Sequence, residues 1–140
     1  MLLTPRTWPH VPKKSDRATP AKDPALDELT KIRNLIRQFR DERDWLQFHN
    51  PKNLACSISI EAAELLEHFQ WKTPEESDAH AKSKRTEISE EIADVAIYLI
   101  ELADVLDIDL PAAIKGKLAL NAAKYPVAKA RGSAAKYTEL

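Results

Sequence analysis

The sequence predicts an all-α protein, and three observations support this fold class. Only two of the 140 residues are glycine, whereas alanine, the strongest helix former, is abundant. So few glycines argue against a β-sandwich or barrel with many tight turns, and they exclude the Gly-rich phosphate loops of P-loop and dinucleotide-binding folds. Beyond residue 25, apolar residues recur every three or four positions, as in amphipathic helices. The length fits one domain, so we expect a bundle of four to five helices.

Residues 1–25 differ from the rest of the chain because they contain five of its nine prolines and no periodic apolar face. We interpret them as a flexible tail, which leaves residues 26–140 as the folded domain. The first helix is predicted over residues 26–46, with Asp23 as its cap and Pro24 in its first turn. Its apolar face consists of Leu26, Leu29, Ile32, Ile36 and Phe39.

The central part of the chain predicts further helical segments. Residues 52–70 repeat the helical rhythm at Leu54, Ile58, Ala62, Leu65 and Phe69. Thr73, Pro74 and Glu76 have the order of a capping box with proline in the first turn, which predicts the start of another segment. The polar stretch 75–84 fits either a short helix or a loop.

Residues 85–107 give the strongest helical pattern, with a stripe formed by Ile88, Ile92, Val95, Leu99, Leu102 and Leu106. Alanine and isoleucine cover much of the other side, and a helix that is apolar nearly all round must be buried on most sides. Four helices of one chain can hardly cover it, so we expect at least a dimer. A last helix is predicted over residues 111–124, opened by Pro111 and ended by Pro126.

The net charge of -1 conceals an uneven distribution along the chain. Residues 23–114 carry a net charge of -10, whereas residues 115–140 carry +5. Solvated helix surface explains this pattern, and so does a cation site beside an anion site. The basic stretches are too short and mixed to indicate nucleic-acid binding. No apolar run approaches the roughly 20 residues of a membrane span, and the single cysteine favours a reducing compartment, which we take as the cytoplasm.

Two pairs of acidic residues form the candidate catalytic site. Glu61 and Glu64 lie three residues apart on one helix face, and Glu91 and Asp94 repeat this spacing within an apolar stretch. A buried carboxylate is costly unless it is paired or binds a metal. Antiparallel packing of the two helices would bring the four carboxylates together, where they would repel one another strongly without a cation. Ion pairing with lysine or arginine is the alternative interpretation.

The all-oxygen ligand set predicts a hard cation, Mg²⁺ or Mn²⁺. Mg²⁺ usually shares its coordination shell with substrate phosphates, so this site favours metal-assisted hydrolysis of a phosphoryl or nucleotidyl group. Lys117, Asn121 and Lys124 recur on one face of the last predicted helix, where they could hold phosphate oxygens. An ordinary exposed polar face is the alternative interpretation.

Aromatic residues lie close to the acidic pairs in the sequence. Tyr98 follows Asp94 by one helical turn, and the helix ends carry Trp45, Phe48, His49 and Trp71. Aromatic faces of this kind can stack a nucleotide base, and they can equally close the ends of the core. His49 has no cysteine or second histidine beside it in the sequence, which argues against a zinc role.

These residues resemble sequence blocks of the MazG-like nucleotide pyrophosphohydrolases, and more closely of their dCTP pyrophosphatase branch. The family carries an E-x-x-E and an E-x-x-D motif on paired helices, which match E-A-A-E at 61–64 and E-I-A-D at 91–94. Three more blocks match: R-D-W-L-Q-F-H at 43–49, K-L-A-L-N-A-A-K-Y-P at 117–126 and R-G-S-A-A-K-Y-T at 131–138. The resemblance covers roughly residues 27–138, and five blocks in order make it specific.

The resemblance implies the all-α NTP pyrophosphohydrolase fold, assembled as a homo-dimer or tetramer. It implies hydrolysis of a nucleoside triphosphate to its monophosphate and pyrophosphate, with Mg²⁺ held by Glu61, Glu64, Glu91 and Asp94. By the same matching, the base and sugar are surrounded by Trp45, His49, Trp71 and Tyr98. The phosphates are held by Lys117, Asn121 and Tyr125.

The leading hypothesis is therefore a Mg²⁺-dependent enzyme that removes dCTP or related pyrimidine nucleotides from the nucleotide pool. Two alternatives remain at this point. One is the same chemistry on dUTP or on modified nucleotides, because base preference depends on the shape of the pocket. The other is a helical nucleotide-binding regulator or scaffold without turnover. The pattern does not single out a general base among the four carboxylates.

Overall fold

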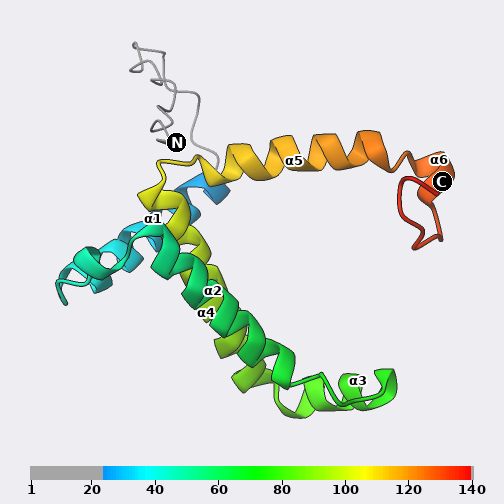
Figure 1. Cartoon of the computed structure of the whole chain (residues 1–140), viewed down its shortest axis with the longest axis horizontal. Coiled ribbons are helices and arrows are strands. Elements are labelled where there is room, and N and C mark those ends of the chain that lie inside the picture. The colour runs from blue at the N-terminus through cyan, green and yellow to red at the C-terminus, as the bar shows by residue number, and fades with distance from the viewer. Residues whose placement is uncertain (1–23, 140) are drawn as a thin grey trace, which may run out of the picture.

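A computed structural model of the chain describes residues 24–139, and this part is helical with no strand among its residues (Figure 1). The predicted all-α class is thus confirmed. Residues 1–23 of the predicted tail, including the proposed cap Asp23, lie outside the described residues. The elements are α1 (Pro24–Asp41), a 3-10 turn (Leu46–Phe48), α2 (Pro51–Glu67), α3 (Pro74–Ser83), α4 (Arg85–Val105), α5 (Leu110–Lys124) and α6 (Val127–Ala130).

Three helices begin where a side chain satisfies a backbone N–H of the first turn. Asn50 accepts a hydrogen bond from Asn53 N at 3.0 Å before α2, and Asp109 accepts one from Ala112 N at 3.0 Å before α5. At α3, Thr73 and Glu76 form the predicted capping box. In each case proline occupies the first turn. The polar stretch after Thr73 is therefore a helix, not a loop.

Helix ends were predicted less well than helix starts. The first helix ends at Asp41 instead of residue 46, because Asp44 adopts a left-handed conformation with φ 52° that an α-helix cannot contain. Trp45 N then donates back to Arg40 O at 3.1 Å. The apolar rhythm itself stops at Phe39, so the predicted end at residue 46 had no periodic support. Similarly, α4 ends at Val105, just before Asp107 with φ 53°.

The α2–α4 pair is the centre of the fold. The two helices run antiparallel side by side, and their mutual contact is the most extensive between any two described elements (Figure 1). Leu54 of α2 is only 1% exposed, and Ile88 and Ala103 of α4 are buried as well. α1 and α3 also pack against α4. Side chains that lie at the same level along the two helices and face each other are therefore held close together.

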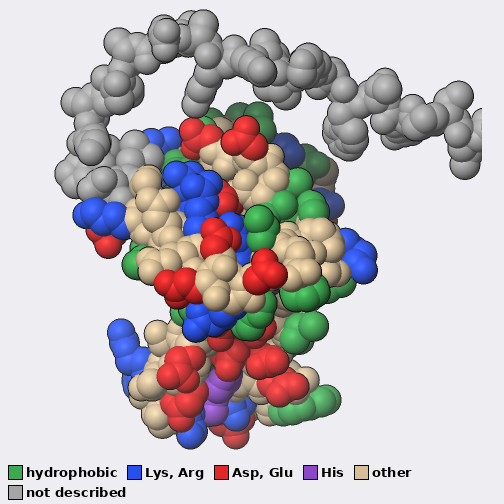
Figure 2. Space-filling model, turned by 90° about the vertical axis from the view of Figure 1, so that its left-hand side faces the viewer, with side chains coloured by type: hydrophobic (Ala, Val, Ile, Leu, Met, Phe, Trp, Pro, Cys, Tyr) green, Lys and Arg blue, Asp and Glu red, His purple; other side chains and the backbone are tan. Residues whose placement is uncertain are grey.

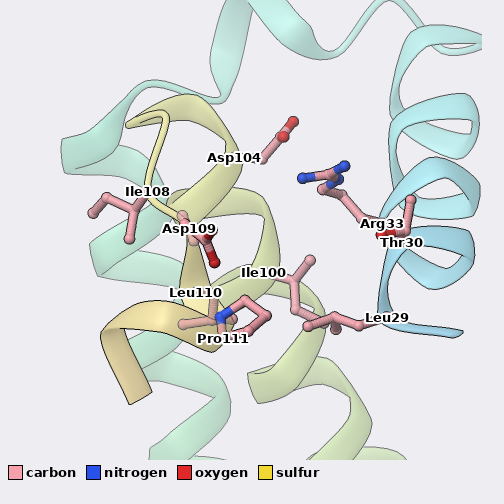
Figure 3. Close-up of a pocket in the computed structure, with 10 residues that line it drawn as sticks. Leu29, Thr30, Arg33, Ile100, Asp104, Ile108, Asp109, Leu110 and Pro111 are labelled. Carbon is pink, nitrogen blue, oxygen red and sulfur yellow. The ribbon is translucent and has the colours of Figure 1, made fainter. Parts of the chain in front are cut away.

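α5 has a different position. It leaves the end of α4 and extends away from the α2–α4 pair (Figure 1), and none of its residues is buried. A cavity of ≈180 Å³ lies where α1, the end of α4 and the first turn of α5 meet (Figure 3). There, Arg33 of α1 extends towards Asp104 of α4, and Arg37 binds the same carboxylate through two nitrogens.

Much apolar surface stays uncovered in the single chain. Ile92 and Leu99 of α4 are 53% and 45% exposed, and Leu118 of α5 is 61% exposed. This agrees with the expectation that one chain cannot bury α4 on most sides. None of the described helices is both long enough and apolar enough to cross a membrane.

Candidate active site

Three carboxylates converge between α2 and α4. Glu61 and Glu64 project from one face of α2, and Glu91 faces them from α4; one carboxylate oxygen from each lies within 4.8 Å of the others. Glu61 and Glu91 are half-buried, and Glu64 is exposed. The helix spacing of three residues and the antiparallel pairing together create this cluster.

The pKa of Glu61 reflects the repulsion between the carboxylates of the cluster. Partial burial raises the pKa of the Glu61 carboxyl above its ordinary value, and the neighbouring charges of Glu64, Asp94 and Glu91 raise it further. A divalent cation among these oxygens would relieve the same repulsion. Hard oxygen ligands without sulfur or imidazole fit an ion of the Mg²⁺ class, so the residues present suit a divalent metal.

Asp94 takes a separate position from the other three predicted ligands. It is exposed and lies outside the cluster, yet it is close enough to raise the pKa of Glu61. Its side chain lines a cavity of ≈470 Å³ between α1 and α4. The structure thus places Asp94 at the boundary between the carboxylate cluster and this cavity.

The cavity has largely aromatic walls. Trp45 lies 6.2 Å from His49, and His49 lies 6.5 Å from Tyr98, measured between ring centroids. Phe39 of α1 meets Trp45 edge to face at 5.9 Å. The structure therefore brings together three of the four residues predicted to surround a base. The fourth, Trp71, is 88% exposed just beyond α2 and lines none of the cavities described here.

Glu101 was missed by the sequence reasoning, although it lines the same cavity. It is only 3% exposed, its Oε1 lies 2.7 Å from Nδ1 of His49, and Nη1 of Arg40 is 3.6 Å from the same oxygen. This contact fixes the orientation of the His49 ring. The signal was present in the sequence, because Glu101 interrupts the apolar surface of the same helix that carries Glu91.

A further cavity of ≈450 Å³ adjoins the carboxylates on the side of α3. It is lined by Glu64 and Glu91 of the cluster together with Glu67, His68, Lys72 and His80. The carboxylates thus lie between an aromatic cavity and a polar one.

The predicted phosphate-binding residues lie elsewhere in the chain. Lys117 and Lys124 are exposed on α5, Asn121 is half-buried there, and Tyr125 caps its end. Lys124 Nζ lies 5.1 Å from the ring centroid of Tyr137, which also contacts Tyr125. Because α5 points away from the α2–α4 pair (Figure 1), the single chain does not bring these residues to the carboxylates.

Comparison with known proteins adds independent information. The sequence model of the MazG-like family matches residues 56–140. dCTP pyrophosphatase 1 of Bos taurus is 44% identical over 122 residues, which cover 86% of this chain and 70% of that protein. dCTP pyrophosphatase 1 of Homo sapiens is 42% identical over 132 residues, which cover 89% and 76%.

A solved structure supports the same relationship. The crystal structure of a pyrophosphatase from Archaeoglobus fulgidus superimposes with a TM-score of 0.67 at 46% identity, covering 78% of this chain and 99% of that one. The family match includes both carboxylate pairs, and the relatives extend over most of the chain. On these grounds the chain belongs to the MazG-like family.

Proposed function

We propose that this chain is a Mg²⁺-dependent nucleotide pyrophosphohydrolase that converts dCTP and water to dCMP and pyrophosphate. The observation that carries this proposal is the convergence of Glu61, Glu64 and Glu91 beside an aromatic-lined cavity. Relatives named dCTP pyrophosphatase support the substrate. As an enzyme of this kind, the protein would remove an unwanted nucleotide from the pool.

The chemistry follows from the position of the carboxylates. Glu61, Glu64, Glu91 and Asp94 are the residues that would hold the ion; when bound, Mg²⁺ supplies positive charge to phosphate oxygens and favours ionisation of water. Water forms a bond to the α-phosphorus as the bond from that phosphorus to the α–β bridging oxygen breaks. The electron pair leaves with pyrophosphate. A carboxylate of the cluster accepts the proton of the water.

The aromatic cavity would hold the base. Trp45 and Tyr98 supply faces for stacking. The Nδ1 atom of His49 contacts Glu101, so in the tautomer that carries its single proton on Nδ1 the Nε2 atom is an acceptor. An acceptor suits the exocyclic amino group of cytosine, whereas the corresponding oxygen of uracil has no hydrogen to donate. This pairing supports dCTP over dUTP.

The predicted phosphate contacts would come from a second subunit. These contacts lie on α5 and at its end, a segment that we call the arm: Lys117, Asn121, Lys124 and Tyr125. The arm points away from the carboxylates of its own chain (Figure 1), and apolar residues of α4 and α5 remain exposed in one chain. A homo-oligomer would cover those residues and bring the arm of one subunit to the cluster of another. We further propose a cytoplasmic location, supported by the single cysteine, Cys56, which is free.

Product analysis tests the proposal. The purified protein is incubated with Mg²⁺ and a panel that contains dCTP, dUTP, CTP and modified pyrimidine triphosphates. We expect dCMP and pyrophosphate, with dCTP used faster than dUTP. Formation of dCDP and orthophosphate would contradict the proposal. Tight binding of dCTP without turnover under any divalent metal would instead identify a nucleotide-binding protein.

A further inference from the structure

Two histidines far from the aromatic cavity contact each other where α2 meets α3. His68 caps the C-terminal end of α2, and His80 lies in the last turn of α3. Nδ1 of His68 is 3.1 Å from Nε2 of His80, and the ring centroids are 5.4 Å apart. Phe69 contacts both rings, so the pair is half-buried against an apolar side chain.

The spacing of the two nitrogens fits a shared metal ion. Zn²⁺ binds imidazole nitrogen at about 2.0–2.1 Å, and two such ligands at a tetrahedral angle are about 3.3 Å apart. The nitrogens of His68 and His80 therefore need to separate by only a few tenths of an ångström, with a tilt of each ring. The ion would replace the hydrogen bond that now joins the rings.

The surroundings favour the form of imidazole that binds metals. Burial lowers the pKa of the His80 imidazole, and the neighbouring Lys72, His68 and Lys84 lower it further, whereas Glu87 opposes this. A metal ion binds the uncharged imidazole through a nitrogen lone pair. Lys72 itself disfavours a cation in the cavity, but three carboxylates line the same space, those of Glu64, Glu67 and Glu91.

We propose that His68 and His80 form a second metal site, which takes a borderline transition ion of the Zn²⁺ class and clamps α3 to the end of α2. The two imidazoles are the defining ligands, with water in the remaining positions, and the carboxylates that line the same ≈450 Å³ cavity supply negative charge around the ion. Figure 2 shows histidine at the end of the molecule that carries α3, with acidic side chains on either side of it and a basic side chain next to it.

This site differs in selectivity from the carboxylate cluster. Nitrogen ligands prefer Zn²⁺, Ni²⁺ or Cu²⁺, whereas the all-oxygen cluster suits Mg²⁺. Glu64 lines the polar cavity and belongs to the cluster, so an ion on the histidines lies next to the Mg²⁺ ligands. The inference does not rest on the proposed hydrolysis, because it concerns metal binding by the histidines alone.

Calorimetric titration with Zn²⁺ tests the site directly. The protein carries no histidine tag and has Cys56→Ser, because the free Cys56 thiol is exposed and could bind zinc. A large excess of Mg²⁺ occupies the oxygen cluster throughout. We expect one Zn²⁺ per chain, with affinity lowered about 10-fold or more in His68→Asn and in His80→Asn. Asp78→Asn, which removes an exposed carboxylate from α3, is the matched control and should leave the affinity unchanged.

Co²⁺ provides a spectroscopic readout that does not depend on activity. Under the same conditions, Co²⁺ should give the strong visible absorption of a tetrahedral site in the Cys56→Ser protein and lose it in His80→Asn. Equal zinc affinity in the parent and both histidine variants would overturn the proposal. If the variants lose helix content, ¹⁵N-detected imidazole resonances of the intact protein decide instead: resonances of His68 and His80 that do not respond to Zn²⁺ exclude the site.

Discussion

The α2–α4 pair and the α5 arm are both regular helices with abundant apolar residues, but one chain covers them very differently. Leu54 of α2 is 1% exposed against α4, whereas Leu118 of α5 is 61% exposed. The pair carries the predicted metal ligands, and the arm carries the predicted phosphate contacts. Packing within the chain therefore brings three of the four predicted metal ligands together and leaves the predicted phosphate contacts far from them.

This difference indicates where each part of the site obtains its rigidity. The carboxylates are fixed by side chains buried between α2 and α4, so their geometry is a property of one subunit. The residues of α5 have no comparable support inside the chain. If the proposed oligomer forms, the arm gains both its packing and its active-site role from a neighbour. The following predictions test this division, from the largest expected effect to the smallest.

Replacing a ligand on the α2–α4 pair should have the largest effect. Glu91→Gln keeps the shape of the side chain but removes its charge, so we expect dCTP hydrolysis to fall about 1,000-fold or more, beyond the 10–100-fold typical of an outer-shell partner. Steady-state kinetics with Mg²⁺ measures this, and circular dichroism checks the fold. Glu90→Gln, an exposed neighbour on the same helix, is the control and should retain activity. Full activity of Glu91→Gln would remove this residue from the site.

Truncating the core of the pair should destabilise the subunit itself. Leu54→Ala creates a cavity between α2 and α4, and we expect a loss of about 3 kcal/mol in the free energy of unfolding, within the range for buried leucines. Denaturant unfolding provides the measurement. Leu118→Ala on the arm is the comparison: its effect should depend on protein concentration, because only association would bury this side chain. Equal, concentration-independent losses would contradict the distinction between the two regions.

Subunit mixing tests whether the arm acts on a neighbouring site. Lys117→Ala removes one charged phosphate contact, so we expect KM to rise about 10-fold, as loss of about 1.4 kcal/mol implies. When Lys117→Ala and Glu91→Gln subunits are unfolded and refolded together, some sites regain both residues. Activity above the average of the separately refolded proteins is expected. An exact average would show that both residues serve the site of their own chain.

The ion pair at the base of the arm should have the smallest effect, restricted to acid. The hydrogen bonds from Arg37 hold the pKa of the Asp104 carboxyl below its ordinary value of 3.8, and nearby positive charges lower it further. A carboxyl with a lowered folded-state pKa adds stability above that ordinary value, and this stability is lost as the pH falls through the folded-state pKa. Asp104→Asn should therefore be less stable than the parent near neutral pH, with the difference shrinking below about pH 4. Thermal unfolding across pH measures it, and a constant difference would contradict it.

Local signals were enough to predict most of the helical framework. The capping box at Thr73 and proline in the first turn marked helix starts correctly, because caps depend on residues adjacent in sequence. The predicted helix ends were less accurate. Asp44 and Asp107 adopt left-handed conformations that end the helices, and neither residue type indicates such a conformation strongly. The short helix α6 had no periodic signal at all.

The candidate site was likewise predicted from the sequence only in part. Spacing of three residues predicted the two carboxylate pairs, and the structure brings Glu91 to Glu61 and Glu64 as expected but sets Asp94 towards the aromatic cavity. The contacts of His49 with Glu101 and of His68 with His80 join residues 52 and 12 positions apart. Such contacts depend on the register between packed helices, which residue spacing along one helix does not specify.

The sequence by itself determined the helical class, the two acidic motifs and the resemblance to a family, because each follows from residues close together along the chain. The tertiary structure decided which carboxylates converge, which buried glutamate orients His49, and that α5 points away from its own cluster. The physical reason is that helix propensity and capping are local, whereas the register and direction of packed helices follow from the fit of buried side chains between them.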